Sequence, residues 1–182
     1  MSATALPLRI EACILAGGLS SRMGRDKSRI RVGNRTMLSH VRAVAKSAGL
    51  PVRVLRKDAV ARCGPLGGIF TALKTSRANA LLFLPCDMPF LTPEILQLLI
   101  ASLRPTDFAV FTIANKLAGF PCLLQRHLAL PIVEQQIAKS ELSLQTLAKA
   151  LRARRLRLPR GWNHQLDNIN TPRELQAARK RG

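Results

Sequence analysis

The sequence predicts an α/β fold, a three-layer sandwich in which helices cover both faces of a mostly parallel sheet. Short apolar runs alternate with longer segments of helical periodicity almost throughout the chain, which is the order that builds such a sheet. The runs are nearly continuous, as in strands that are buried on both faces. From the length of 182 residues we expect one domain over 1–182, and ligands should bind beyond the carboxyl ends of its strands.

The individual elements follow from local patterns. The run IEACIL is a strand that ends at two glycines, and ALLFL is a second buried strand that leads into PCDMP. Thr92-Pro93 and Thr171-Pro172 each supply an N-cap and a first-turn proline for a helix. We expect GPLGG, at 64–68, to be a loop that opens the helix IFTALK. The predicted strands are 10–15, 52–55, 80–84, 108–113 and the segment around 156–158, and the predicted helices are 36–48, 69–74, 95–103, 129–138, 143–152 and the stretch after 171.

The composition is strongly basic, with 29 Lys and Arg against 10 Asp and Glu and a net charge of +19. This charge attracts anions, so nucleotides, phosphorylated metabolites, nucleic acid and acidic membrane surfaces are all candidates. Much of the excess lies in 152–160 and at the C-terminus, where solvated arginines are the alternative explanation. The chain has no Tyr and a single Trp, which disfavours nucleic acid, because its binding proteins stack bases on aromatic side chains.

Hydropathy and cysteine spacing indicate a cytoplasmic protein. No apolar run approaches the roughly 18 residues that span a bilayer, and the N-terminus lacks a signal-peptide pattern. We therefore expect no membrane partner. The four cysteines have no CxxC or histidine spacing, which indicates reduced thiols and not a zinc site or a disulfide framework.

A glycine-rich segment, LAGGLSSRMGRDK at 15–27, follows the first strand. Its glycines allow the backbone to approach a ligand closely, so that N–H groups can point at phosphate oxygens. The segment matches neither GxGxxG nor the Walker pattern. The alternative is an ordinary turn between a strand and a helix with solvated cations. The candidate phosphate ligands are the backbone of Gly17 and Gly18, the hydroxyl of Ser20 and the charges of Arg22 and Lys27.

Four motifs together resemble one known family. They are LAGGLSSRMGRDK, GPLGG, CDMP at 86–89 and NINTPREL at 168–175, and they span most of the chain in the family's order. On these motifs the sequence resembles the molybdenum cofactor guanylyltransferase family of nucleotidyltransferases. The resemblance implies a Rossmann-like fold of the nucleotide-diphospho-sugar transferase type. It also implies transfer of a nucleoside monophosphate, expected to be GMP from GTP, to a phosphorylated pterin, molybdopterin, with release of pyrophosphate.

The resemblance implies roles for residues in each motif. Asp87 is the expected ligand of Mg²⁺, which carboxylates and phosphates hold together, and Pro85 and Pro89 predict an extended backbone around it. Lys27 would neutralise the leaving pyrophosphate, and Arg22 would grip phosphate oxygens. Further nucleotide contacts are expected from Leu15, Ala16, Gly17, Gly18, Ser20 and Asp58, and acceptor contacts from Gly67, Gly68, Asn168 and Asn170.

The chain departs from the family pattern in one region. Only 14 residues, 50–63, separate Gly49 from Gly64, whereas relatives have an additional strand-helix unit there that helps to read the base. Compared with the family pattern one unit is therefore missing, and CTP and ATP remain alternatives to GTP. The motif AGFP, at 118–121, matches only loosely the loop that approaches the pterin.

Several alternatives remain open at this point. The chain could be a sugar-phosphate nucleotidyltransferase, or an inactive relative that binds nucleotides or nucleic acid. Asp58 could be a surface carboxylate, and Asn168 and Asn170 could simply precede a helix. A molybdoenzyme chaperone or cofactor-delivery protein is a further partner that the resemblance implies.

Overall fold

The computed structural model describes residues 8–17, 27–57, 59–60, 63–114 and 116–180. In this part of the chain six strands form one sheet in the order β4-β1-β5-β7-β6-β8, and β2 and β3 form a separate hairpin. The strands are β1 (Ile10–Leu15), β2 (Arg31–Val32), β3 (Arg35–Thr36), β4 (Val52–Leu55), β5 (Ala80–Pro85), β6 (Ala109–Ala114), β7 (Leu117–Gln125) and β8 (Arg154–Leu156). The helices are α1 (Met37–Ser47), α2 (Gly64–Thr75), α3 (Pro93–Ser102), α4 (Arg126–Ala138), α5 (Leu144–Ala150) and α6 (Pro172–Arg179), with short 3₁₀ helices η1 (Lys27–Arg29) and η2 (Asn163–Leu166).

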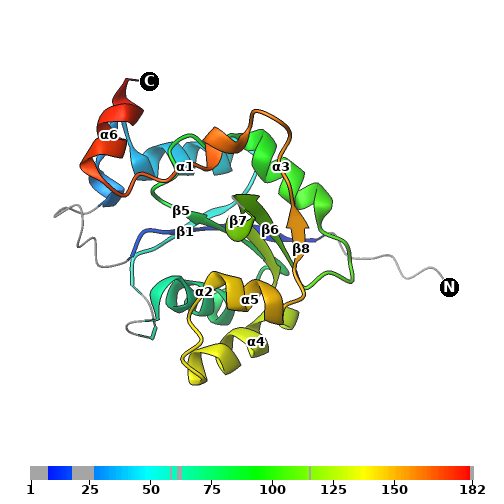
Figure 1. Ribbon diagram of the computed structural model, residues 1–182. Helices are drawn as coiled ribbons and strands as arrows, with labels where there is room; N and C mark the ends of the chain where they lie inside the picture. The colour runs from blue at the N-terminus through cyan, green and yellow to red at the C-terminus, as the bar shows by residue number, and fades with distance from the viewer. Residues whose placement is uncertain (1–7, 18–26, 58, 61–62, 115, 181–182) are drawn as a thin grey trace.

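The two faces of the sheet carry separate apolar cores, so the molecule has three layers. Helices α2, α4 and α5 cover one face, and α1 and α3 cover the other (Figure 1). Along β5, Leu81 and Phe83 enter the first core while Leu82 and Leu84 enter the second, because successive side chains of a strand point to opposite faces. The prediction of a three-layer α/β sandwich with strands buried on both faces is confirmed.

One strand of the sheet, β7, is absent from the sequence-based prediction. It lies between β5 and β6 and is antiparallel to both, while the other three pairings are parallel. Gly119 and Pro121 interrupt its apolar pattern, which is typical of a loop. The strand accommodates them by a register shift opposite Phe111 and Thr112, a common position for such residues. The motif AGFP, which matches the family's loop only loosely, therefore lies in a strand.

The prediction of a loop at GPLGG is also wrong, because these residues form the start of α2. Pro65 is compatible with a first turn, where its missing N–H would have had no partner. Leu66, Gly67 and Gly68 are buried. Their packing against the sheet stabilises a helix that two glycines would disfavour on propensity alone.

Other local predictions hold. The helix predicted over 36–48 is α1, and the Thr36 hydroxyl oxygen caps it by accepting from the Ser39 N–H at 3.1 Å. All four cysteines are buried thiols. Between α1 and α2 the described residues contain a single strand, β4, at one edge of the sheet, in agreement with the short spacing there. None of the helices in the described ranges is long and apolar enough to cross a membrane.

Candidate active site

The carboxyl ends of β4, β1 and β5 meet at one edge of the sheet. Leu15, the last residue of β1, pairs with Pro85, the last residue of β5. Gly17 lies so close to the end of β4 that a Cβ at this position would be 3.0 Å from the carbonyl oxygen of Arg56. Glycine is therefore the residue that fits here without a shift of the backbone. The end of β1 also lies beside the turn that holds Asp87, because the Cys86 N–H donates to the Leu15 carbonyl oxygen at 3.1 Å.

Lys27 connects two segments that are distant in the sequence. Its ammonium group donates to Asp87 Oδ2 at 3.0 Å and to Asn170 Oδ1 at 2.5 Å. The first of these contacts is an ion pair whose side chains are 19% and 17% exposed. The structure thus brings three predicted site residues into direct contact.

The backbone of Asp87 is anchored independently of its side chain. Asp87 lies in a turn directly after β5, so the expectation of an extended backbone is wrong. A proline restricts the residue before it, and Pro85 and Pro89 therefore leave Asp87 free to turn. The Asp87 carbonyl oxygen accepts from the Ile169 N–H at 2.9 Å, which holds the segment 168–170 against the turn.

The first turn of α6 fixes the backbone of Asn170. Thr171 is the N-cap, and its hydroxyl oxygen accepts from the Glu174 N–H at 3.2 Å. The Glu174 carboxylate accepts in return from the N–H groups of Thr171 at 2.9 Å and Asn170 at 2.6 Å, so the helix begins with a capping box. The Asn170 N–H is the largest cause that lowers the pKa of Glu174, and the charge of Lys27 lowers it further. The negative charge of Glu174 therefore lies close to the cluster of Lys27, Asp87 and Asn170, which we call the Lys27 cluster.

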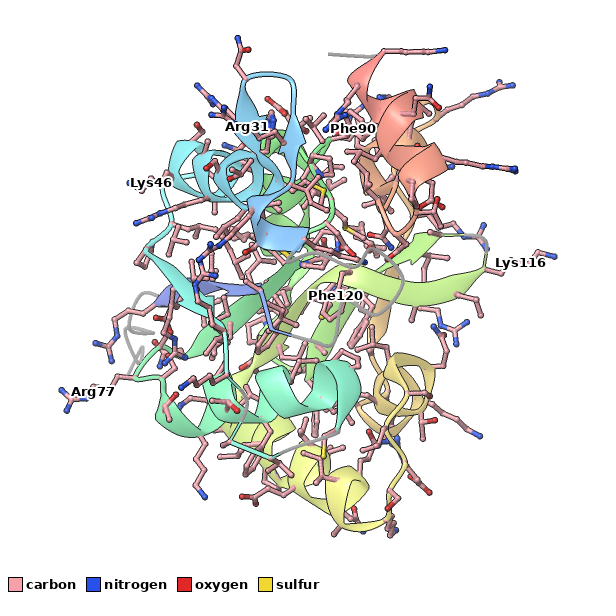
Figure 2. The ribbon with its side chains drawn as sticks, turned by 90° about the vertical axis from the view of Figure 1, so that its left-hand side faces the viewer. Arg31, Lys46, Arg77, Phe90, Lys116 and Phe120 are labelled. Atoms are coloured by element: carbon pink, nitrogen blue, oxygen red, sulfur yellow. The ribbon has the colours of Figure 1, made fainter. Side chains whose placement is uncertain are left out.

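A cavity of about 580 Å³ adjoins this cluster, a size that suits a small-molecule ligand. Asn168 and Asn170 form part of its wall, together with the ring of Phe90, which lies near α6 in Figure 2. A second cavity, of about 320 Å³, shares Phe90 and is lined by the β2–β3 hairpin and His40. The other residues that line the larger cavity are Ala114, Asn163, His164, Leu166, Asp167, Ile169, Glu174, Ala177 and Ala178.

Comparison with known proteins decides the family. The sequence model of the MobA-like NTP transferase domain matches residues 12–157. The chain belongs to this family. Membership identifies it as a nucleotidyltransferase and confirms the family predicted from the four motifs.

Two curated relatives illustrate the similarity of the MobA-like chain. It is 29% identical over 177 residues to a probable molybdenum cofactor guanylyltransferase from Flavobacterium johnsoniae, an alignment that covers 89% of this chain and 92% of that protein. It is 34% identical over 128 residues to a molybdenum cofactor guanylyltransferase from Acinetobacter baumannii, covering 69% of this chain and 60% of that protein. The chain thus spans less than two thirds of the length of some of the relatives it matches.

Solved structures share the fold of the MobA-like chain. A nucleotidyl transferase from Methanothermobacter thermautotroptrophicus has a TM-score of 0.74 at 16% identity, covering 95% of this chain and 97% of that one. The molybdopterin-guanine dinucleotide biosynthesis protein A from Archaeoglobus fulgidus has a TM-score of 0.70 at 18% identity, covering 93% and 97%. At these identities the likeness shows the fold alone.

Other predicted nucleotide contacts of the MobA-like chain lie at the end of β1. The Ala16 N–H donates to the Leu55 carbonyl oxygen at 2.8 Å, so this donor is used by the sheet and is not available to a nucleotide. Leu15 and Gly17 lie on either side of it. The remaining predicted contacts, Gly18, Ser20, Arg22 and Asp58, are outside the described residues.

The predicted acceptor contacts are divided between two places. Asn168 and Asn170 line the larger cavity. Gly67 and Gly68 are buried in α2, which covers the opposite face of the sheet from α1 and α6 (Figure 1). A contact of an acceptor with these two glycines stays a prediction.

Sequence reasoning missed the relation of Glu174 to the site. Thr171 and Glu174 form the pattern Thr-x-x-Glu, which identifies a helix start and nothing more. The sequence holds no signal that the same carboxylate also binds the N–H of Asn170. Phe90 and Asn163 were missed as well, because their place in the cavity wall depends on the packing of distant segments.

The oxygen donors at the site suit a hard cation. Within the described ranges no three His, Cys, Asp or Glu side chains gather into a metal-binding group. A single carboxylate, Asp87, is nevertheless a sufficient protein ligand for Mg²⁺, because this ion retains waters and binds the phosphate oxygens of its substrate. The amide oxygens of Asn168 and Asn170 are of the same hard donor type. The site of the MobA-like chain is therefore compatible with magnesium.

Proposed function

We propose that this chain transfers GMP from GTP to a phosphorylated pterin, molybdopterin, with release of pyrophosphate and with Mg²⁺ as its cofactor. The observation that carries the proposal is the cluster of Lys27, Asp87 and Asn170 beside a cavity of about 580 Å³. Relatives named molybdenum cofactor guanylyltransferase support this choice of donor and acceptor. Their names also support a role in molybdenum cofactor biosynthesis.

The reaction brings two anions together. An oxygen of the acceptor phosphate attacks the α-phosphorus of the nucleotide, the bond from this phosphorus to the bridging oxygen breaks, and pyrophosphate leaves with the electron pair. Two unit charges about 4 Å apart repel by about 4 kcal/mol at an effective dielectric constant near 20. Fixed positive charges beside the reacting oxygens offset this repulsion and stabilise the transition state.

Among the residues that the structure describes, Lys27 is the cation that we assign to this stabilisation of negative charge. Two of its N–H groups point at Asp87 and Asn170, and an ammonium group has a third to donate. A contact of this third N–H with the β-phosphate would neutralise the charge that develops on the leaving pyrophosphate. The hydrogen bond from Lys27 to Asn170 holds the ammonium group in place while the nucleotide binds.

Asp87 would hold the magnesium ion, with waters and phosphate oxygens as the other ligands. When bound, the ion supplies positive charge that polarises the α-phosphate. The turn after β5 and the bond from the Ile169 N–H orient Asp87 toward the edge of the sheet where ligands of α/β proteins bind. Arg22 remains a predicted phosphate ligand.

The cavity beside α6 fits the ring of the acceptor. A pterin is a planar heterocycle with hydrogen-bond donors and acceptors along its edge. Phe90 offers a flat apolar surface to such a ring, and the amides of Asn163 and Asn168 can both donate and accept. Asn170 lines the cavity and also contacts Lys27, so a ring bound here would direct its phosphate toward the cluster.

A panel of nucleotide donors tests the proposal. The purified protein is incubated with Mg²⁺, molybdopterin and one of GTP, CTP or ATP, while pyrophosphate is assayed and the dinucleotide product is identified by mass spectrometry. We expect GTP to react at least about tenfold faster than CTP or ATP, and omission of molybdopterin or Mg²⁺ to abolish release.

Each part of the proposal can fail separately. A faster reaction with CTP would refute the choice of donor. Reaction with a sugar phosphate, and none with molybdopterin, would refute the choice of acceptor. Absence of pyrophosphate with every pair of substrates would refute the transferase reaction itself. Transfer of the product to a cofactor-delivery protein stays a prediction from the family.

A further inference from the structure

The capping box of α6 contains one hydrogen bond more than a helix start requires. In such a box the carboxylate of the third helical residue accepts from the N–H of the N-cap, and here Glu174 Oε2 accepts from Thr171 at 2.9 Å. The same oxygen reaches one residue further and accepts from the Asn170 N–H at 2.6 Å. This additional bond fixes the residue whose side chain contacts Lys27.

The backbone of Asn170 is held from both directions. Glu174 binds its N–H, and the preceding residue, Ile169, donates its own N–H to the Asp87 carbonyl oxygen at 2.9 Å. The Ile169 side chain is buried in a small apolar core that is shared by the hairpin, α1 and α6. Since the backbone on both sides is fixed, the Asn170 amide oxygen is directed at the ammonium group of Lys27.

Helix α6 also contacts the hairpin that follows Lys27. Arg179, at the end of α6, donates from Nε to the Arg31 carbonyl oxygen at 3.4 Å. Arg31 lies on the hairpin directly after η1, where the Ile30 N–H donates to the Lys27 carbonyl oxygen at 3.1 Å. Figure 2 shows Arg31 and Phe90 at the end of the molecule where α6 lies. Arg179 at the end of α6 thus contacts the hairpin after Lys27, while Asn170, just before α6, contacts the Lys27 ammonium group.

We propose that Glu174 is a positioning residue for the transferase reaction: through Asn170 it holds the Lys27 ammonium group where the triphosphate binds. This inference rests on the proposed function, but the arrangement of Lys27 is a property of the protein without substrate. The competing explanation is that Glu174 only stabilises the end of a helix. The two explanations differ in what happens to Lys27 when Glu174 is changed.

Glu94 provides a matched control. It lies in the first turn of α3 after Thr92 and Pro93, so α3 and α6 share a Thr-Pro start and an early glutamate. The contact that lowers the pKa of Glu94 most is with Thr92. Glu94→Ala therefore removes a first-turn carboxylate from a helix of similar length without touching the Lys27 cluster.

Acylation of lysine measures the position of Lys27 without substrate. The full chain is treated briefly with an N-hydroxysuccinimide ester, and the labelling rates of Lys27 and of Lys46, which is exposed on α1, are compared by mass spectrometry. An amine held in two hydrogen bonds reacts only when it is released, so Glu174→Ala should raise the ratio of Lys27 to Lys46 labelling about threefold or more. Glu174→Gln keeps an oxygen acceptor and should stay near the wild-type ratio, as should Glu94→Ala.

A double-mutant cycle carries the test into catalysis. We expect Glu174→Ala to lower kcat about tenfold and to have little further effect in a Lys27→Met background, because residues that act through one another are not additive. A purely structural role predicts the same factor in both backgrounds. If Glu174→Ala does not fold, Asn170→Ala leaves the capping box intact and should release Lys27 to the same degree.

The outcomes separate the two proposals. An unchanged labelling ratio in folded Glu174→Ala, or an equal rise in Glu94→Ala, would overturn the positioning role. Equal losses of kcat in the wild-type and Lys27→Met backgrounds would also overturn it. A raised labelling ratio in a protein that releases no pyrophosphate would support the arrangement of Lys27 and refute the proposed function alone.

Discussion

Replacement of Asp87 by Asn removes one negative charge from the candidate site and keeps the shape of the side chain. We expect a loss of turnover of about 100-fold or more, the scale on which loss of a positioned electrostatic group acts, or about 2.7 kcal/mol in the barrier. The reason is that Asp87 is the carboxylate expected to bind magnesium, whereas an amide is a much weaker ligand for a hard cation.

The structure predicts only a small effect of Asp87→Asn on stability. The turn is held by the bond from the Ile169 N–H to the Asp87 carbonyl oxygen, which the substitution does not change. The ion pair with Lys27 is partly buried, with side chains 19% and 17% exposed, but asparagine keeps an oxygen that can accept from Lys27, so we expect a loss of about 1 kcal/mol. In a chain of this length that corresponds to a shift in Tm of about 2–4 °C.

The assay combines pyrophosphate release with thermal unfolding followed by circular dichroism. Asp107→Asn is the control. Asp107 forms a similar ion pair with Arg154 at 2.8 Å, and the exposed fractions of the two side chains are 19% and 27%. Arg154 lies on β8, at the other edge of the sheet from β4. Retention of more than about a tenth of the turnover in Asp87→Asn would refute the reasoning. An equal loss in Asp107→Asn would assign the effect to charge in general and refute it as well.

Three further predictions concern stability and reactivity. Gln136 is buried, and neither of its amide atoms has a hydrogen-bond partner among the described residues. Gln136→Leu should therefore raise the free energy of unfolding by about 1–2 kcal/mol in urea denaturation, and a lower midpoint would contradict this. Gly17→Ala places a Cβ 3.0 Å from the Arg56 carbonyl oxygen and should lower stability by about 1–3 kcal/mol, which an unchanged Tm would exclude. Burial raises the pKa of the Cys13 thiol from 9.0 to about 12. The neutral thiol's contribution to the free energy of unfolding is therefore complete below pH 9 and falls as the pH rises toward 12. Cys13→Ala should therefore lose less Tm than the wild type between these values, and an identical loss would argue against the raised pKa.

Local sequence patterns predicted most of the fold. The continuous apolar runs at β1 and β5 and the Thr-Pro starts of α3 and α6 gave correct elements because the periodicity of hydrophobic residues and the chemistry of caps act over a few neighbouring residues. The errors at β7 and at the start of α2 have one cause. In both places Gly and Pro favour a loop locally, and burial against the sheet outweighs that preference.

The candidate site was predicted as a set of residues and not as an arrangement. The motifs in the sequence include Lys27, Asp87 and Asn170. Asp87 is 60 positions from Lys27 in the chain, and Asn170 is 143 positions from it. No local pattern specifies a contact over such separations. The role of Glu174 was missed for the same reason. A capping pattern indicates a helix start, but it does not indicate that Glu174 binds Asn170, which in turn contacts Lys27.

The sequence by itself determined that this protein is an α/β nucleotidyltransferase of the MobA-like family, because family motifs and apolar periodicity are written in consecutive residues. Only the tertiary structure decided that the amide oxygen of Asn170 and the carboxylate of Asp87 share the ammonium group of Lys27. The physical reason is that β1 and β5 end in register while α6 packs on the hairpin that follows Lys27, so packing between remote segments brings these three polar groups together.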